Sequence, residues 1–217
     1  MPGKKKPTRK PSPTPKPATP DEHSRFSALR YPDLDLAVEP LDELVSQARS
    51  KGFVPIGRRR TEEHPYGVRV HESLSSNQGV VRLVVHDDEL MPAMVLEISG
   101  PAEPSATIEQ LVEQCMEIAS APEVLATARI EYHDDPAMLS LAAWVATDAE
   151  EADLLALLTE ASLDADVEVR RGAAKALLVQ ASPACRALAE TMAMAERDPT
   201  LAKQIGQMLS MWGASKK

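Results

Sequence analysis

Two segments in the first half of the chain have apolar residues at the period of an α-helix. The first segment, residues 39–52, ends at Gly52. The positions that share one helix face in it are Leu41, Leu44, Val45 and Ala48. In the second, residues 106–120, the stripe consists of Ile108, Leu111, Val112, Cys115 and Ile118. Each segment therefore predicts an amphipathic helix with one buried side.

Between these two segments the pattern changes to the two-residue alternation of β-strands. Short β-branched segments separated by "SSNQG" and "DDELMP" predict three antiparallel strands over residues 67–73, 79–86 and 93–99. The segment "ATARIEY", residues 126–132, is interpreted as a fourth strand. Helices on one face of a small antiparallel sheet are typical of an α+β domain.

From residue 134 onward the strand pattern disappears and the remainder is helical. Three acidic starts, Asp134, Asp166 and Asp198, lie 32 positions apart, and each precedes an apolar helical stripe. A further helical segment lies between successive starts. Because a helix pair cannot bury its apolar side alone, this regular spacing predicts stacked helix pairs, each with an Asp as a helix cap.

The middle copy, "DADVEVRRGAAKALLVQAS", resembles a HEAT repeat of the short bacterial kind that also occurs in phycobilisome-lyase-type proteins. Besides its Asp, the matching positions are Val169, Arg170, Ala173, Ala174 and Leu177. The resemblance covers residues 134–212; it is partial in the last copy and poor in the first. It implies a binding surface or scaffold, and not lyase activity, because no bilin-site pattern is visible. An ordinary helical bundle with coincidental spacing is the alternative.

These patterns together predict an α+β fold with three regions. Residues 1–25 form a disordered tail, residues 26–133 a small antiparallel-sheet domain flanked by helices, and residues 134–213 an all-α HEAT-like helical repeat stack. The order of elements in the α+β region resembles that of secretion-chaperone-like bacterial adaptor folds, a resemblance that implies nothing about function.

Charge is divided unevenly along the chain. The first 20 residues hold six bases, no acid and seven of the 18 prolines, whereas the remaining residues hold all 33 acids against 18 bases. The six bases are Lys4, Lys5, Lys6, Arg9, Lys10 and Lys16. Such a segment cannot bury enough apolar surface to offset its ordering entropy. It is either a solubilising tether or a weak electrostatic contact for nucleic acid or another anionic surface.

Candidate chemistry is sparse. The tripeptide "HDD" occurs at His86–Asp88 and His133–Asp135, where ligation of a divalent metal competes with turn and helix-cap roles that fit each place better. Cys115 and Cys185 lie on apolar helix faces and are expected to be packed thiols without a disulfide. No nucleophile, phosphate-loop or dinucleotide motif is present. We therefore expect no catalytic residue, metal or cofactor.

The sequence favours a non-enzymatic protein-binding adaptor or scaffold. No apolar segment is long enough to span a bilayer and no secretory signal is visible, so a cytoplasmic location is expected. One arginine of the pair Arg170–Arg171 is expected to bond to acids of a neighbouring repeat and the other to contact the partner. The remaining candidate contacts are Met192, Met194, Met211 and Trp212, with core packing as the alternative for the methionines. Two other hypotheses are tail-mediated binding to nucleic acid or an anionic assembly, and an immunity or chaperone protein that neutralises one partner.

Overall fold

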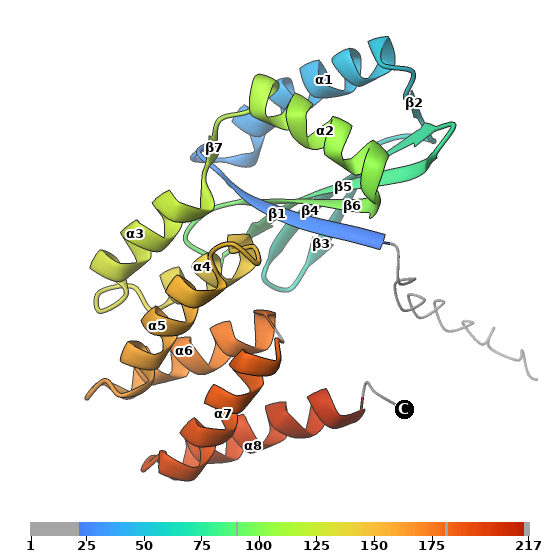
Figure 1. Cartoon of the computed structure of the whole chain (residues 1–217). Coiled ribbons are helices and arrows are strands. Elements are labelled where there is room, and N and C mark those ends of the chain that lie inside the picture. Colours follow the sequence, from blue (N-terminus) through green and yellow to red (C-terminus); the bar gives the residue numbers. More distant parts are fainter. Residues whose placement is uncertain (1–21, 90, 181, 215–217) are drawn as a thin grey trace, which may run out of the picture.

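The computed structural model describes residues 22–89, 91–180 and 182–214, which form a seven-stranded antiparallel sheet and a stack of helices (Figure 1). The strands are β1 (Glu22–Leu29), β2 (Val54–Pro55), β3 (Arg60–His64), β4 (Gly67–Ser76), β5 (Gly79–Asp88), β6 (Val95–Pro101) and β7 (Ile118–Ala119). The helices are α1 (Leu34–Ser50), α2 (Ala102–Cys115), α3 (Ala121–Glu131), α4 (Ala137–Val145), α5 (Glu151–Ser162), α6 (Val167–Gln180), α7 (Pro183–Ala195) and α8 (Pro199–Ala214). The prediction of a mixed α+β protein is confirmed.

The sheet has the strand order β2-β4-β5-β6-β1-β7, and β3 pairs with the other end of β4. The three predicted strands are confirmed as β4, β5 and β6. Residues 22–25 are a correction, because they do not belong to the tail: Arg25 pairs with Ile98 as part of β1. Pairing on both sides, with β6 and β7, holds β1 in the sheet although its sequence is poor in β-branched residues. The rest of the predicted tail lies outside the described residues.

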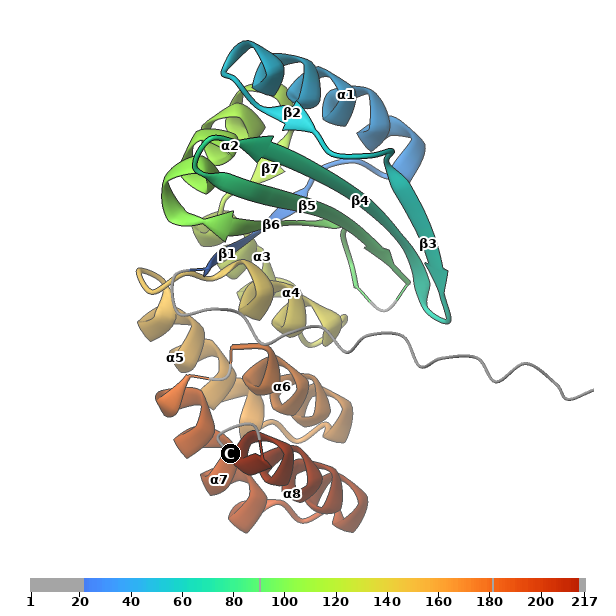
Figure 2. The same ribbon diagram turned by 90° about the vertical axis from the view of Figure 1, so that its right-hand side faces the viewer.

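The two faces of the sheet are covered differently. Helices α1 and α2 lie on one face (Figure 1) and bury its apolar positions, among them Leu74, Leu83 and Ile98. On the opposite face α4 packs against β1, where Ala28 and Val95 join the core of the helix stack. The ends of β4 and β5 near the β3–β4 turn project beyond α1 and α2 (Figure 2). The second face is therefore covered at β1 and β6 but not along its whole width.

The helix stack consists of three pairs. Helix α3 packs on α4, α5 on α6 and α7 on α8, and α6 also contacts α4 and α8 (Figure 2). The prediction of a fourth strand over residues 126–132 is wrong, since nearly all of this segment belongs to α3. Ser120 and Glu123 form a capping box at the start of α3, and Val124, Ala128 and Tyr132 are buried at helical spacing. Alternation in "ATARIEY" imitates a strand, yet the helical period of its larger apolar neighbours decides the structure.

The second helix of each pair, α4, α6 or α8, is called the inner helix, and aspartates at the 32-residue spacing cap two of them, α6 and α8. The side chain of Asp166 accepts a hydrogen bond from the backbone N–H of Glu168, and Asp198 accepts one from Leu201, each at 2.8 Å. In the first pair it is Asp135, the residue after the repeat position, that accepts from Ala137 at 3.0 Å. The start of the inner helices is thus built alike in all three pairs, whereas kinship with HEAT repeats stays a prediction.

Helix α4 joins the two parts of the molecule, and its contact with α6 requires a glycine. At Gly172 of α6, a Cβ atom would lie 2.7 Å from the carbonyl oxygen of Pro136 and 2.9 Å from its Cβ. Real Cβ atoms do not come so close to backbone atoms, so only glycine allows α6 to approach the start of α4 this closely. Glycine inside a helix costs conformational entropy, and here that cost is offset by close packing.

We predict that Gly172→Ala destabilises the protein by about 1–3 kcal/mol, the range for overpacking a tight contact, although alanine is the better helix former. Gly206 of α8 is the matched control: a Cβ atom at this position would meet nothing within 4 Å, so Gly206→Ala should stabilise by roughly 1 kcal/mol. Urea unfolding followed by circular dichroism measures both changes. An unchanged or raised stability of Gly172→Ala would contradict the close contact between α4 and α6.

Candidate functional site

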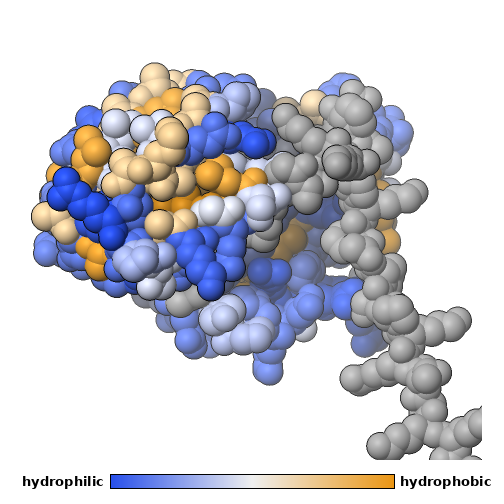
Figure 3. Space-filling model, turned by 90° about the horizontal axis from the view of Figure 1, so that it is seen from below, coloured by the Kyte–Doolittle hydropathy of each residue, from blue (hydrophilic) through white to orange (hydrophobic). Residues whose placement is uncertain are grey.

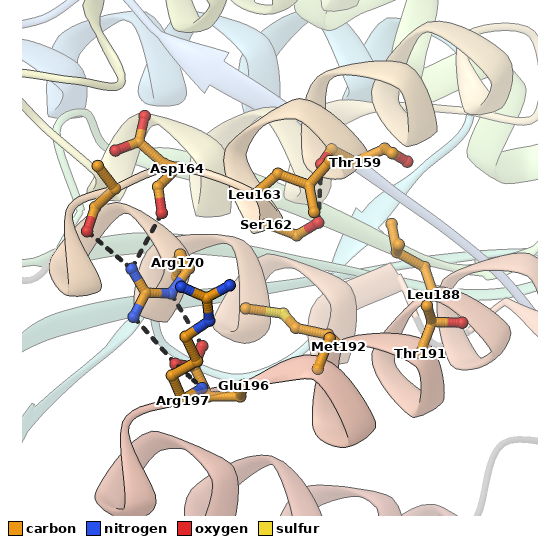
Figure 4. Close-up of a pocket in the computed structure, with 12 residues that line it drawn as sticks. Thr159, Ser162, Leu163, Asp164, Arg170, Leu188, Thr191, Met192, Glu196 and Arg197 are labelled. Atoms are coloured by element: carbon orange, nitrogen blue, oxygen red, sulfur yellow. Dashed lines mark hydrogen bonds and ion pairs between the residues drawn. The ribbon is translucent and has the colours of Figure 1, made fainter.

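Arg170, one of the predicted partner contacts, is engaged inside the protein (Figure 4). Its guanidinium donates two hydrogen bonds of 2.9 Å to the carboxylate of Glu196, which follows α7. It donates two more, also of 2.9 Å, to the backbone carbonyls of Asp164 and Ala165. Arg170 is thus the arginine of the pair that bonds to an acid of the neighbouring helix pair, and these bonds use four of its five N–H groups.

The ion pair between Arg170 and Glu196 is largely withdrawn from water. The side chain of Glu196 is 1 % exposed, and its carboxylate also accepts from the backbone N–H groups of Arg197 and Asp198 at 2.8 Å. The hydrogen bonds from Arg170 are the main reason that the pKa of Glu196 falls to about 2, against the opposing effect of burial. Since α6 is bonded here to the turn between α7 and α8, the pair connects the second and third helix pairs.

The other predicted contacts are spread over the end of the stack. Met192 is buried and lines a cavity of about 580 Å³ between α5 and α7, close to Arg170 (Figure 4). Met194 is 83 % exposed, Trp212 packs partly against the core of the stack, and the side chain of Met211 lies outside the described residues. Seen from this end, apolar residues are interspersed with hydrophilic ones (Figure 3). The structure does not gather these residues into one site.

A second cavity, of about 560 Å³, lies between the sheet and the helix stack, beside the contact of α4 with β1. Its sheet wall includes Arg69, His86 and Asp88 from β4 and β5. Its helix wall includes Ala137, Ser140 and Trp144 from α4, and Glu168, Arg171 and Lys175 from α6. We call this cavity the interdomain cleft. The α+β part and the helix stack both contribute side chains to it, and Arg171 is the predicted partner contact that lies in it.

Trp144 is fixed in the wall of the interdomain cleft by two aromatic contacts. Its ring meets Phe26 of β1 edge-on with the centroids 4.9 Å apart, and His86 of β5 with the centroids 5.3 Å apart. His86 is held in turn by Glu97 of β6, at 3.0 Å from its Nε2 atom. Edge-to-face contacts of this kind stabilise a defined ring orientation. The indole is therefore a rigid apolar surface next to the charged groups.

Cations in the interdomain cleft are incompletely paired. Among the described residues, Arg69 and Lys175 make no hydrogen bond or ion pair, whereas Arg171 pairs with Glu168 on its own helix. The Nε atoms of Arg69 and Arg171 are both buried and have no hydrogen-bond partner. Buried donors without acceptors cost free energy and are rare in folded proteins. The cleft thus offers unused N–H groups to an acceptor from outside.

The sheet beside the interdomain cleft is also rich in positive charge. Arg69 lies opposite His86 across the β4–β5 pair, and His71 lies two residues further along the same face of β4. Burial is the main cause that lowers the pKa of His71; Glu62 opposes it, and the positive charges of Arg60 and Arg69 lower the pKa further. Arg60 and Arg69 thus place two permanent positive charges on this face, although the chain after residue 20 is acidic overall.

The described part of the chain was predicted to hold no metal site, and the two "HDD" tripeptides are the places to compare with that expectation. No cluster of three or more His, Cys, Asp or Glu side chains there has the arrangement of a metal site. The first "HDD" tripeptide lies within β5, and of the second, His133 follows α3 and lies 3.2 Å from Asp164. Ser140 lines the interdomain cleft with His86, yet no hydrogen bond between described residues joins them.

Both cysteines are free thiols, as predicted from their apolar surroundings. Cys185 is fully buried in the stack, while Cys115, at the end of α2, is only partly buried. Burial raises the pKa of the Cys115 thiol, and the charge of Glu43 raises it further. A raised pKa disfavours the thiolate, which is the nucleophilic form.

No protein-family model, curated protein or solved structure matches this chain, so its site is interpreted from its own geometry. None of the described helices combines the length and the apolar character needed to cross a membrane.

Among the residues that line the cleft, Arg171 was predicted from the sequence as a partner contact. The sequence analysis did not identify four other lining residues as candidates: Arg69, His86, Trp144 and Lys175. Arg69 and His86 are 17 positions apart and become neighbours only through the register of β4 and β5. Lys175 lies one helical turn after Arg171, a signal that the sequence does contain. Only the position of α6 opposite the sheet shows that Arg171 and Lys175 line the same cavity.

We predict that Glu196→Gln lowers the free energy of unfolding by about 2–4 kcal/mol near neutral pH, because Arg170 loses its charged partner in a buried place. The pKa of Glu196 in the folded protein is about 2, below the ordinary value of 4.5. The stabilisation is therefore complete above pH 4.5 and is lost as the pH falls toward 2.

The measurement is urea unfolding of both proteins at a series of pH values. Glu190→Gln is the control, since Glu190 is half exposed and pairs with Arg186 on the surface of α7; its loss should change stability by less than about 1 kcal/mol. If the difference in the free energy of unfolding between wild type and Glu196→Gln does not become smaller in acid, the assigned role of the ion pair is contradicted.

Proposed function

We propose that this chain is a non-enzymatic adaptor that binds a partner protein in the interdomain cleft. The observation that carries the proposal is the cleft itself, in which unpaired cations and a fixed tryptophan from two parts of the chain face one cavity. Tryptophan and arginine are the side chains that most often dominate binding energy at protein interfaces. A volume of about 560 Å³ has room for several side chains of a docked segment.

For the helix stack in particular, we propose that it is a short HEAT-like array. Three helix pairs with similarly capped inner helices, the 32-residue spacing and an arginine bonded to the next pair all support it. Arrays of this kind present one row of helices as a binding surface. Here that row includes α4 and α6, which form the helix wall of the interdomain cleft.

A second candidate rests on the basic composition of residues 1–20, which lie outside the described residues. Six bases without an acid would attract nucleic acid or another anionic assembly in a salt-dependent way. In that case the folded part would position the tail. An immunity or chaperone role, in which one toxin or effector is neutralised, is a special case of the adaptor proposal.

The adaptor proposal is tested by affinity capture from native lysate with three full-length proteins: wild type, Lys175→Glu and Lys203→Glu. Both lysines are exposed, so neither change should unfold the protein, but only Lys175 lines the interdomain cleft. We expect wild type and Lys203→Glu to retain the same protein, and Lys175→Glu to retain at least tenfold less of it.

A chain that begins at Asp21 should capture that protein as well as wild type does, also in roughly 0.5 M salt, where exposed charges are strongly screened. Capture that is equal for all three full-length proteins and disappears without residues 1–20 would reject the interdomain cleft as the binding site and favour the second candidate.

A further inference from the structure

We propose that the interdomain cleft recognises carboxylate side chains in an acidic segment of the partner protein. This inference rests on the adaptor proposal and adds the chemistry of what is bound. Three observations support it: cationic groups with unused hydrogen-bond donors, the charge balance of the cleft, and the fixed apolar surface beside these groups.

Arg69 supplies the first anchor from the sheet. It makes no hydrogen bond or ion pair with any described residue, and its Nε atom is buried without a partner. Its terminal guanidinium nitrogens are not among the buried unsatisfied atoms, and Arg69 lines the cleft. A carboxylate that bridges Nε and a terminal nitrogen would satisfy the buried donor through two parallel hydrogen bonds.

Arg171 and Lys175 supply the second anchor from α6. Arg171 pairs with Glu168, whose side chain is 59 % exposed, and the Nε atom of Arg171 is buried and unsatisfied. An exposed pair within one helix is weak, so an arriving carboxylate can share the guanidinium at little cost. Lys175 has no partner among the described residues and adds a third positive charge.

The charge balance favours carboxylates over a polyanion. Three cationic side chains, Arg69, Arg171 and Lys175, line the cleft together with the two acids Asp88 and Glu168. The surplus is small, and the chain after residue 20 carries 33 acids against 18 bases. A nucleic acid would meet strong repulsion beyond the cleft, whereas one or two carboxylates need only the local surplus.

The rest of the lining explains why a peptide, rather than a free small anion, is the occupant. Trp144 and Val179 bring apolar surface next to the cations, and Met91 adds an adaptable thioether. Acidic residues that alternate with apolar ones would use both kinds of contact. The basic tail of this chain does not match the cleft in charge, because its six bases would face Arg69, Arg171 and Lys175.

The test is selection from a random dodecapeptide library displayed on phage, with the full-length protein as bait. Ser140→Trp is the counter-selection bait: it fills the cleft from α4, keeps the basic tail, and so removes peptides that bind the tail or other surfaces. Circular dichroism checks that this variant is folded. We expect peptides that depend on an open cleft, with aspartate and glutamate enriched at least twofold over the unselected library.

Selected peptides are then synthesised and titrated by fluorescence anisotropy. We expect about tenfold weaker binding to Arg69→Gln and to Lys175→Gln, the usual effect of losing one hydrogen bond to a charged group. Arg129→Gln should bind normally, because Arg129 is an exposed arginine of α3 outside the cleft. Inorganic phosphate at roughly 10 mM should displace no more peptide than chloride at equal ionic strength.

The outcomes distinguish failure of this inference from failure of the adaptor proposal. Cleft-dependent peptides without acidic enrichment, or with unchanged affinity for Arg69→Gln and Lys175→Gln, would overturn the carboxylate inference and leave the adaptor proposal standing. Displacement by phosphate alone would also overturn it, in favour of a phosphate site. Self-association of the bait through the cleft, seen by light scattering, would make a second copy the occupant and overturn the inference as well. If no peptide depends on the cleft, both proposals fail.

Discussion

The close packing of α4 between the sheet and α6 is the contact on which the rest of the structure depends. On one side α4 covers β1, and on the other the backbone of Pro136 meets Gly172 without an intervening side chain. Because the contact at Gly172 has no room for a side chain and α4 also packs on β1, α4 connects the helix stack to the sheet through close packing on both sides. The interdomain cleft exists because α4 fills only part of the space between them, leaving the ends of β4 and β5 opposite α6.

The two adjacent arginines of α6 show how one helix serves both stability and binding. Arg170 donates four of its five N–H groups to Glu196 and two carbonyl groups, so it connects neighbouring helix pairs. Arg171 lies in the cleft and keeps an unsatisfied buried donor. A folded protein rarely retains such a donor where nothing uses it, since satisfaction by a neighbour would be more stable. The contrast between these neighbours is what distinguishes a structural arginine from a candidate binding residue.

The sequence predicted much of the fold where local periodicity and tertiary packing agree. The three central strands, the amphipathic faces of α1 and α2 and the second helix of each pair in the stack follow from their apolar spacing. The exception is Ile118, which was predicted in the α2 stripe but lies in β7, where it pairs with Leu29 of β1. Helix α3 was missed because alternation in residues 126–132 competes with a helical stripe, and β1 because pairing on both edges outweighs its weak propensity. The cleft could not be predicted, since Arg69, Trp144 and Lys175 are brought together only by strand register and by the docking of α4.

The most direct test of the central claim, that the interdomain cleft is where a partner protein binds, is photo-crosslinking in native lysate. A photoreactive phenylalanine derivative would replace Ser140 in the cleft wall or, as a control, the exposed Asp153 on α5. We predict one discrete adduct from position 140, suppressed by excess acidic peptide, and none from position 153. No adduct from position 140, together with adducts from position 153 or from the first 20 residues, would contradict the claim.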